Sequence, residues 1–172
     1  MKHLLVYAVS RRSISRRALP VSGDYTTCMR SLDHARELLA QDVADPGQPV
    51  LGTSHLPDVV SMFTGWCLYD LGRPAQAASL LDREIERIPE HAFRTRGRHN
   101  VRRALAHAAA GEVDHACAIA VDALACVRLT CSATVAADLR KLSRTLGRHR
   151  GRAAVRSLAP DLAFAIARTS AT

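Results

Sequence analysis

The sequence is poor in aromatic residues and in long apolar segments. Aromatic side chains make up 4% of the 172 residues, whereas 48% of the residues are hydrophobic, so alanine and leucine carry most of the burial. Such small aliphatic side chains suit closely packed helices and offer few β-branched runs for strands. No apolar run approaches the roughly 20 residues that a membrane helix needs, and the first residues lack a secretory signal pattern. We therefore expect an all-α, cytoplasmic protein with no membrane segment.

The sequence also lacks motifs for catalysis and for cofactor binding. It contains no GxSxG, GxxxxGK[ST] or GxGxxG pattern, so we expect a protein that is not an enzyme and has no cofactor. The five cysteines form no CxxC pair, which favours free, buried thiols over disulfides or a zinc site. His99, His107 and His115 are eight residues apart without an accompanying carboxylate-rich helix, and we predict no metal site.

The segment 58–89 predicts a helical hairpin and organises the rest of the chain. One helix ends at Gly72 and the next begins at Pro74, the usual punctuation between two antiparallel helices. Small and large residues alternate at the spacing of a tetratricopeptide repeat, which lets two helices pack closely. The matching residues are Gly65, Leu68, Gly72, Ala77, Leu81 and Pro89.

The same pattern returns over residues 97–128, where Gly111 takes the place of Gly72 after a shift of 39 residues. This period exceeds the usual length of about 34, so the link before the second repeat is either a longer loop or an earlier helix start. Residues 132–168 predict further helices, with a break near Pro160.

Residues before the first repeat are less regular. We expect a poorly structured basic arm over 1–24, followed by a helix over 25–43 that carries one apolar stripe. This helix has the packing residues of the second helix of a repeat, but no first helix precedes it. The chain is therefore expected to be part of a longer protein, or to use the arm as a cap. The overall prediction is a tetratricopeptide-like helical-hairpin solenoid of about seven helices over 25–172.

The run from Leu51 to about Ala163 resembles the C-terminal tetratricopeptide-like region of actinobacterial transcriptional regulators. The resemblance is carried by GTSHLPDVVSMFTGWCLYDLGRP, RRALAHAAAGEVDHACAIA and ATVAADLRKLSRTLGRHRGRAAVRSL. In that family a helix-turn-helix of the xenobiotic-response-element type precedes the repeats, and no segment of this chain matches it. The resemblance implies a ligand-sensing or protein-interaction region that binds a peptide, a partner protein or a second copy of itself.

An aromatic row on the first helix of the first repeat is the first candidate site. Phe63, Trp66 and Tyr69 recur at every third residue, and the first helix of such a repeat lines the concave surface. The next repeat adds arginines, which suit carboxylates or aromatic faces. The alternative is that Phe63 and Trp66 pack in the core. The predicted interaction groove contains Met62, Phe63, Trp66, Tyr69, Asp70, Arg98 and Arg102.

Basic residues supply two further candidates. Five arginines and His99 cluster over 94–103, either as an anion-binding surface or as a solvated face paired with Glu84, Glu86 or Glu90. The net charge of +8 comes almost entirely from the last fifty residues, which hold nine basic and two acidic groups. A basic patch of Arg148, Arg150 and Arg152 makes a nucleic-acid-binding regulatory protein the alternative function.

Overall fold

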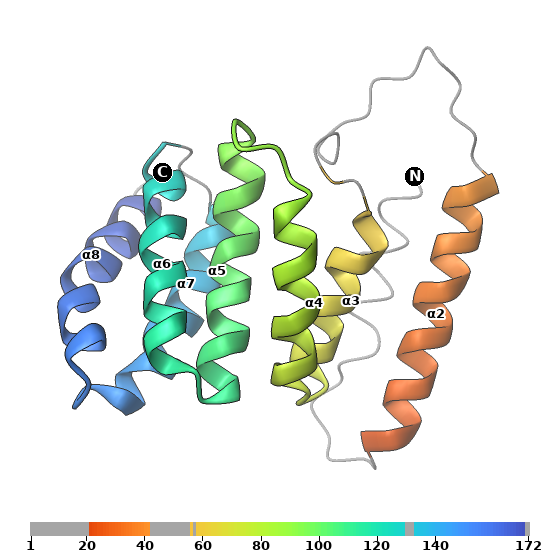
Figure 1. Ribbon diagram of the computed structural model, residues 1–172, viewed down its shortest axis with the longest axis horizontal. Coiled ribbons are helices and arrows are strands. Elements are labelled where there is room, and N and C mark those ends of the chain that lie inside the picture. Colours follow the sequence, from red (N-terminus) through yellow and green to blue (C-terminus); the bar gives the residue numbers. More distant parts are fainter. Residues whose placement is uncertain (1–20, 42–55, 57, 130–132, 171–172) are drawn as a thin grey trace.

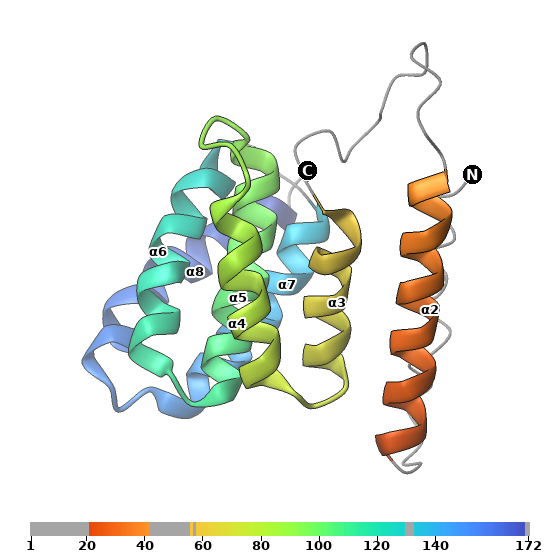
Figure 2. The same ribbon diagram turned by 45° about the vertical axis from the view of Figure 1, so that its right-hand side comes forward.

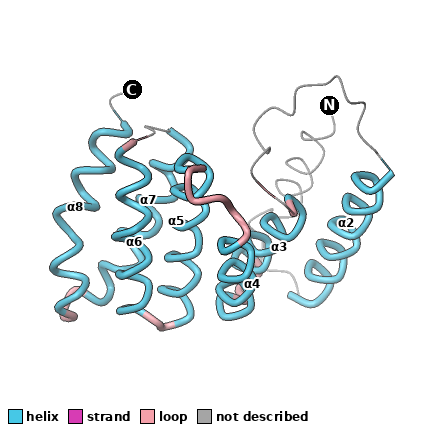
Figure 3. The backbone as a smooth tube through the Cα atoms, turned by 45° about the horizontal axis from the view of Figure 1, so that its top comes forward, coloured by secondary structure: helices cyan, strands magenta, loops and turns pink. Residues whose placement is uncertain are grey.

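The computed structural model describes residues 21–41, 56, 58–129 and 133–170, and helices joined by short turns make up nearly all of this part of the chain (Figure 3). No strand occurs among these residues. The predicted all-α solenoid of tetratricopeptide-like hairpins is confirmed. Its elements are α2 (Val21–Gln41), α3 (Val59–Asp70), α4 (Pro74–Glu86), α5 (Phe93–Ala110), α6 (Val113–Arg128), α7 (Ala133–Leu146), the 3-10 helix η1 (Gly147–His149) and α8 (Ala153–Ser170).

Three hairpins follow one another along the molecule, from α3–α4 through α5–α6 to α7–α8 (Figure 1). The first helices of the second and third hairpins, α5 and α7, pack against each other, and so do the second helices α6 and α8. Helix α4 packs on α5 and joins the first hairpin to the second. None of the described helices combines the length and the apolar character needed to cross a membrane.

The turns within the first two hairpins depend on glycine. Gly72 and Gly111 have φ angles of 74° and 93°, in the left-handed region that glycine adopts without a steric penalty. Gly65 serves a different purpose, since a Cβ atom added there would lie 2.8 Å from the side chain of Leu81 on α4. The predicted close approach of α3 and α4 at Gly65 is thus confirmed.

Two buried clusters make up most of the core. The larger one joins α5, α6, α7 and α8 around side chains such as Leu105, Leu139 and Leu142, each without exposed surface, and it also takes in Trp66 of α3. The smaller one lies between α3 and α4, where Leu81 and Ile88 are almost fully buried. The apolar positions predicted from the repeat pattern therefore supply the core.

Helix α2 lies at the edge of the solenoid beside α3 (Figure 2). It begins at Val21, four residues before the predicted start at Tyr25, so Gly23 is accommodated inside the helix at a cost of about 1 kcal/mol. Cys28 and Leu32 pack against the α3 side chains of Val60 and Cys67. The predicted basic arm lies outside the described residues, except for 21–24, which are helical.

The start of α5 decides between two predicted alternatives, and the course of α8 differs from the prediction. Helix α5 begins at Phe93, so the additional residues between the repeats are used mainly in an earlier helix start. Helix α8 continues through Pro160 without the predicted break. Proline leaves the carbonyl of Arg156 without its helical donor, but both residues are exposed to solvent, while Leu158 and Leu162 anchor the opposite face.

Candidate functional site

Trp66 of α3 lies at the centre of a cluster of aromatic and cationic side chains. Its ring stacks on Tyr69 with centroids 5.1 Å apart and planes inclined by 17°. The guanidinium carbon of Arg102, on α5, lies 4.3 Å from the ring centroid, and the Lys141 amino nitrogen, on α7, lies 5.0 Å from it. Both distances are in the range of cation–π attraction. Three successive first helices of the hairpins thus meet at one indole ring.

A buried ion pair holds this cluster together. Arg102 donates its Nε–H to Asp138 Oδ2 of α7 across 2.9 Å, and the two side chains are only 9% and 7% exposed. Water competes poorly for a pair that is so well covered, so breaking it by removing one partner leaves a costly buried charge. The ion pair therefore fixes α5 to α7 beside Trp66.

Two further titratable groups surround the ring. Burial raises the pKa of Asp70, although the positive charges of Lys141 and Arg102 act to lower it. Partial burial also raises the pKa of the Tyr69 phenol, which lies within the electrostatic reach of Asp70 and Arg148. We call the surface formed by Tyr69, Asp70, Lys141 and Arg148, over the buried Trp66, the inner face.

The predicted groove residues separate into two sets. The structure brings Trp66, Tyr69, Asp70 and Arg102 together, but Met62 is buried between α3 and α4, and Phe63 packs toward α2. Each residue of an α-helix is rotated by about 100° from the residue before it. Six such steps separate Phe63 from Tyr69, so their side chains point about 120° apart. Arg98 is half-buried one turn before Arg102.

Sequence analysis did not identify Asp138, Lys141 or Arg148 as members of this surface, although Arg148 belonged to the predicted basic patch. These residues lie about 40 positions from Arg102 in the sequence. Only the packing of α7 on α5 brings them to Trp66. The available signal was the pair of charged residues Asp138 and Lys141, three residues apart on the amphipathic helix α7.

The predicted arginine cluster does not form a single surface. Arg96 donates to the carbonyl oxygens of Ile85 and Ile88 at the end of α4, the latter at 2.7 Å. Arg102 pairs with Asp138 and Arg103 with Asp82. The partners of these three arginines are therefore not the predicted glutamates.

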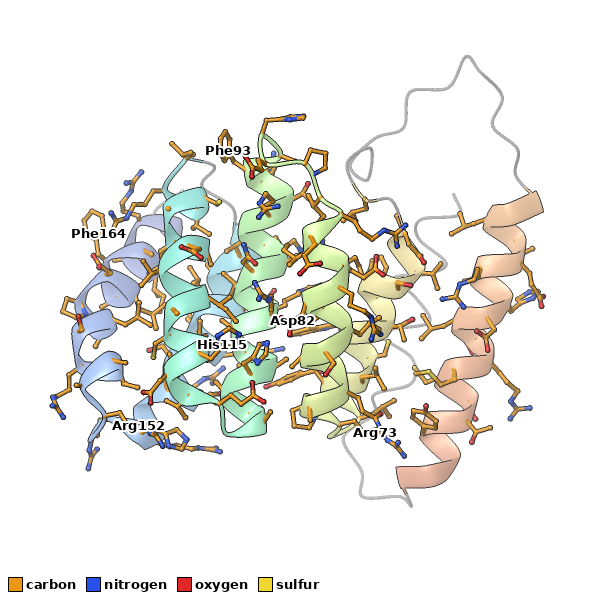
Figure 4. The ribbon with its side chains drawn as sticks, viewed as in Figure 1. Arg73, Asp82, Phe93, His115, Arg152 and Phe164 are labelled. Carbon is orange, nitrogen blue, oxygen red and sulfur yellow. The ribbon has the colours of Figure 1, made fainter. Side chains whose placement is uncertain are left out.

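The predicted basic patch is also divided. Arg152 donates to Asp114 of α6 across 2.6 Å. Arg148 instead lies near Tyr69 on the inner face, where its positive charge acts against the rise in the pKa of the phenol. Arg150 is exposed at the turn between them. Figure 4 shows Arg152 at the lower edge of the molecule, far from the labelled Phe164 and Phe93.

A second polar cluster lies where α4, α5 and α6 meet. Its histidines, His107 and His115, were predicted to form no metal site, and the carboxylates of Asp82 and Glu112 were not predicted to lie beside them. The buried His107 ring has Asp82 Oδ1 3.0 Å from Nε2 and Glu112 Oε2 2.6 Å from Nδ1. The His115 ring lies edge-on to it, with centroids 4.6 Å apart. Burial raises the pKa of Asp82, but hydrogen bonds from His107 and Arg103 outweigh it, and the pKa lies below its ordinary value.

His99, on α5, has a contrasting environment. Its Nδ1 atom is buried without a hydrogen-bond partner among the described residues. Burial lowers the pKa of His99 to about 3, and the neighbouring Arg102 and Arg98 charges act in the same direction. His99 is therefore neutral at physiological pH.

Comparison of the chain with protein-family models, with curated proteins and with solved structures finds no match.

Proposed function

We propose that this protein is an interaction module that binds an acidic peptide segment of a partner protein on its inner face. The observation that carries the proposal is the convergence of Arg102 and Lys141 on the Trp66 ring, beside the stacked Tyr69. Recognition by helical repeats commonly uses such a mixture of aromatic area and charge on one surface. Binding, not catalysis, is the proposed activity.

The charge of the inner face favours an acidic partner. Asp138 neutralises Arg102, and the accessible groups that remain are Lys141 and Arg148 against Asp70. The two exposed cations are free to attract carboxylates, while the half-buried Tyr69 offers apolar area to a side chain of the partner. Burial of Trp66, which is 7% exposed, makes it a support for this surface.

The resemblance to regions of actinobacterial transcriptional regulators supports a regulatory role in the cytoplasm, in which the partner segment reports a cellular signal. A second copy of this chain is the second occupant to test. Binding of nucleic acid through Arg148 and Arg150 is a further outcome of the same experiment, since both arginines are exposed.

Trp66 is the only tryptophan of the chain, so its fluorescence reports binding at the inner face directly. The probe is a helical peptide with glutamate and leucine at i, i+4 spacing, compared with the same peptide carrying lysine for glutamate. We expect the acidic peptide to change the fluorescence of Trp66 and the basic peptide to leave it unchanged.

Lys141→Glu reverses the charge beside the ring, and we expect about tenfold weaker binding of the acidic peptide, the equivalent of about 1.4 kcal/mol. Arg83→Glu is the matched control, since Arg83 is an exposed cation on α4. Equal affinity of the two variants would contradict the proposal. Binding of duplex DNA in preference to the acidic peptide, with steep salt dependence, would replace it by the nucleic-acid function.

A further inference from the structure

The polar cluster at the junction of α4, α5 and α6 has the composition of a metal site. Asp82 lies in the middle of α4, His107 lies four residues before Gly111, and His115 lies four residues after it. The left-handed turn at Gly111 folds α6 back along α5 and thereby brings the two imidazoles together. Figure 4 shows Asp82 and His115 extending from α4 and α6 on the same side of the molecule.

The donor atoms are close enough to share one ion. One ligand atom from each of Asp82, His107 and His115 lies within 4.8 Å of the others, and Asp82 Oδ1 is 3.0 Å from His107 Nε2. Ions of the zinc type bind imidazole nitrogen and carboxylate oxygen at about 2.0–2.2 Å. Two donors in one tetrahedral shell therefore lie about 3.3 Å apart, so small side-chain rotations suffice.

Glu112 gives His107 the orientation that a ligand needs. Without a metal ion, Nε2 donates to Asp82 Oδ1 across 3.0 Å, and a bound ion would replace that proton. Nδ1 would keep its proton and donate it to Glu112 Oε2 across 2.6 Å, so the lone pair of Nε2 would face the ion. A metal-ligating histidine usually donates the N–H of its other ring nitrogen to a carboxylate or a carbonyl oxygen. The His107 side chain is 5% exposed, so its ring is held in this orientation by packing.

The cluster is open to solvent on the other side. His115 is exposed and the Asp82 side chain is 35% exposed, so an ion can reach both from water. Arg103 donates to Asp82 Oδ1 and fixes this carboxylate from beside the site. Asp82, His107 and His115 come from three different helices, so an ion held by them would cross-link α4, α5 and α6.

We propose that the protein binds one divalent transition-metal ion of the zinc class through Asp82, His107 Nε2 and His115, with Glu112 accepting a hydrogen bond from His107 Nδ1. One coordination position remains for water or an external ligand. Imidazole and carboxylate donors together suit such ions, whereas calcium and magnesium prefer oxygen alone. This site is separate from the inner face and does not depend on the proposed function.

The test uses the full chain with any affinity tag removed and with bound metal stripped by a chelator. Calorimetric titration with zinc chloride should give one ion per chain, and zinc should raise the melting temperature. His115→Gln removes an exposed ligand without disturbing the core, and we expect at least tenfold weaker binding. Glu112→Gln leaves all three ligands in place, and we expect binding about 10-fold to 100-fold weaker.

His91→Gln is the matched control, since His91 is an exposed histidine outside the cluster, and its affinity should equal that of the wild type. Titration with Co²⁺ adds a spectroscopic measurement, because ligation by nitrogen and oxygen gives visible bands without thiolate charge transfer. Absence of binding to the wild type would overturn the proposal. Equal affinity of His115→Gln and wild type, or a thiolate band from the cysteines, would also overturn it.

Discussion

Two clusters of polar side chains on α5 differ in how far their members are exposed to solvent. On one side of α5, Arg102 and Asp138 form an ion pair that is covered on both partners and capped by the Trp66 ring. Farther along, His107 is buried, but its partners Asp82 and Glu112 are 35% and 56% exposed. The first cluster has the properties of an internal connection between helices, and the second has an open side. At the first cluster a ligand can therefore meet only the exposed side chains of the inner face over Trp66, whereas at the second it can reach Asp82 and His115 themselves.

The largest expected effect is at the closed cluster. Asp138→Ala leaves the guanidinium of Arg102 buried without its partner, and we expect the free energy of unfolding to fall by about 3–5 kcal/mol. Urea unfolding monitored by circular dichroism measures the change. Asp114→Ala is the control, because the Arg152–Asp114 pair is exposed and worth about 0–1 kcal/mol. Similar losses in both variants would show that the burial of the ion pair is unimportant.

A smaller effect is expected at the open cluster. Asp82→Ala removes an acceptor from His107 and from Arg103, and we expect a loss of about 1–3 kcal/mol in the free energy of unfolding. Water replaces part of the interaction because Asp82 is partly exposed. The same urea unfolding applies in metal-free buffer. A loss as large as that of Asp138→Ala would contradict the distinction between a closed and an open cluster.

The effect that is smallest near neutral pH concerns the pH dependence of stability. His99 has a pKa of about 3 in the folded protein against an ordinary value of 6.5, so between these values the unfolded chain binds one more proton. Stability therefore rises with pH through this window and is lost as the pH falls, by up to about 1.4 kcal/mol per pH unit. His99→Gln should reduce that slope between pH 6 and pH 4 in urea unfolding.

The exposed His91 supplies the comparison for this measurement. We expect a smaller slope for His99→Gln than for His91→Gln when the two variants are measured side by side between pH 6 and pH 4. Equal slopes for the two variants would show that the neutral state of buried His99 makes no contribution to the pH dependence of stability.

The architecture could be predicted from the sequence, because the signals for helical hairpins are local. Gly72 and Gly111 adopt the left-handed turns that their positions predict, and Gly65 lies where α3 and α4 touch. These features depend on residues within one hairpin. The start of α2 and the continuation of α8 through Pro160 were predicted incorrectly, because apolar packing along each helix outweighs one unfavourable residue.

The contacts between polar side chains depend on how the hairpins pack on one another. Arg102 and Asp138 are 36 residues apart, and Asp82 and His107 are 25 residues apart. No local periodicity relates such positions, since the rotation of α4 and α7 about their axes is set by packing against α5. Phe63 and Trp66 are three residues apart and yet contribute to different cores. Helix formation is encoded locally in this chain, whereas its candidate sites arise from contacts between hairpins.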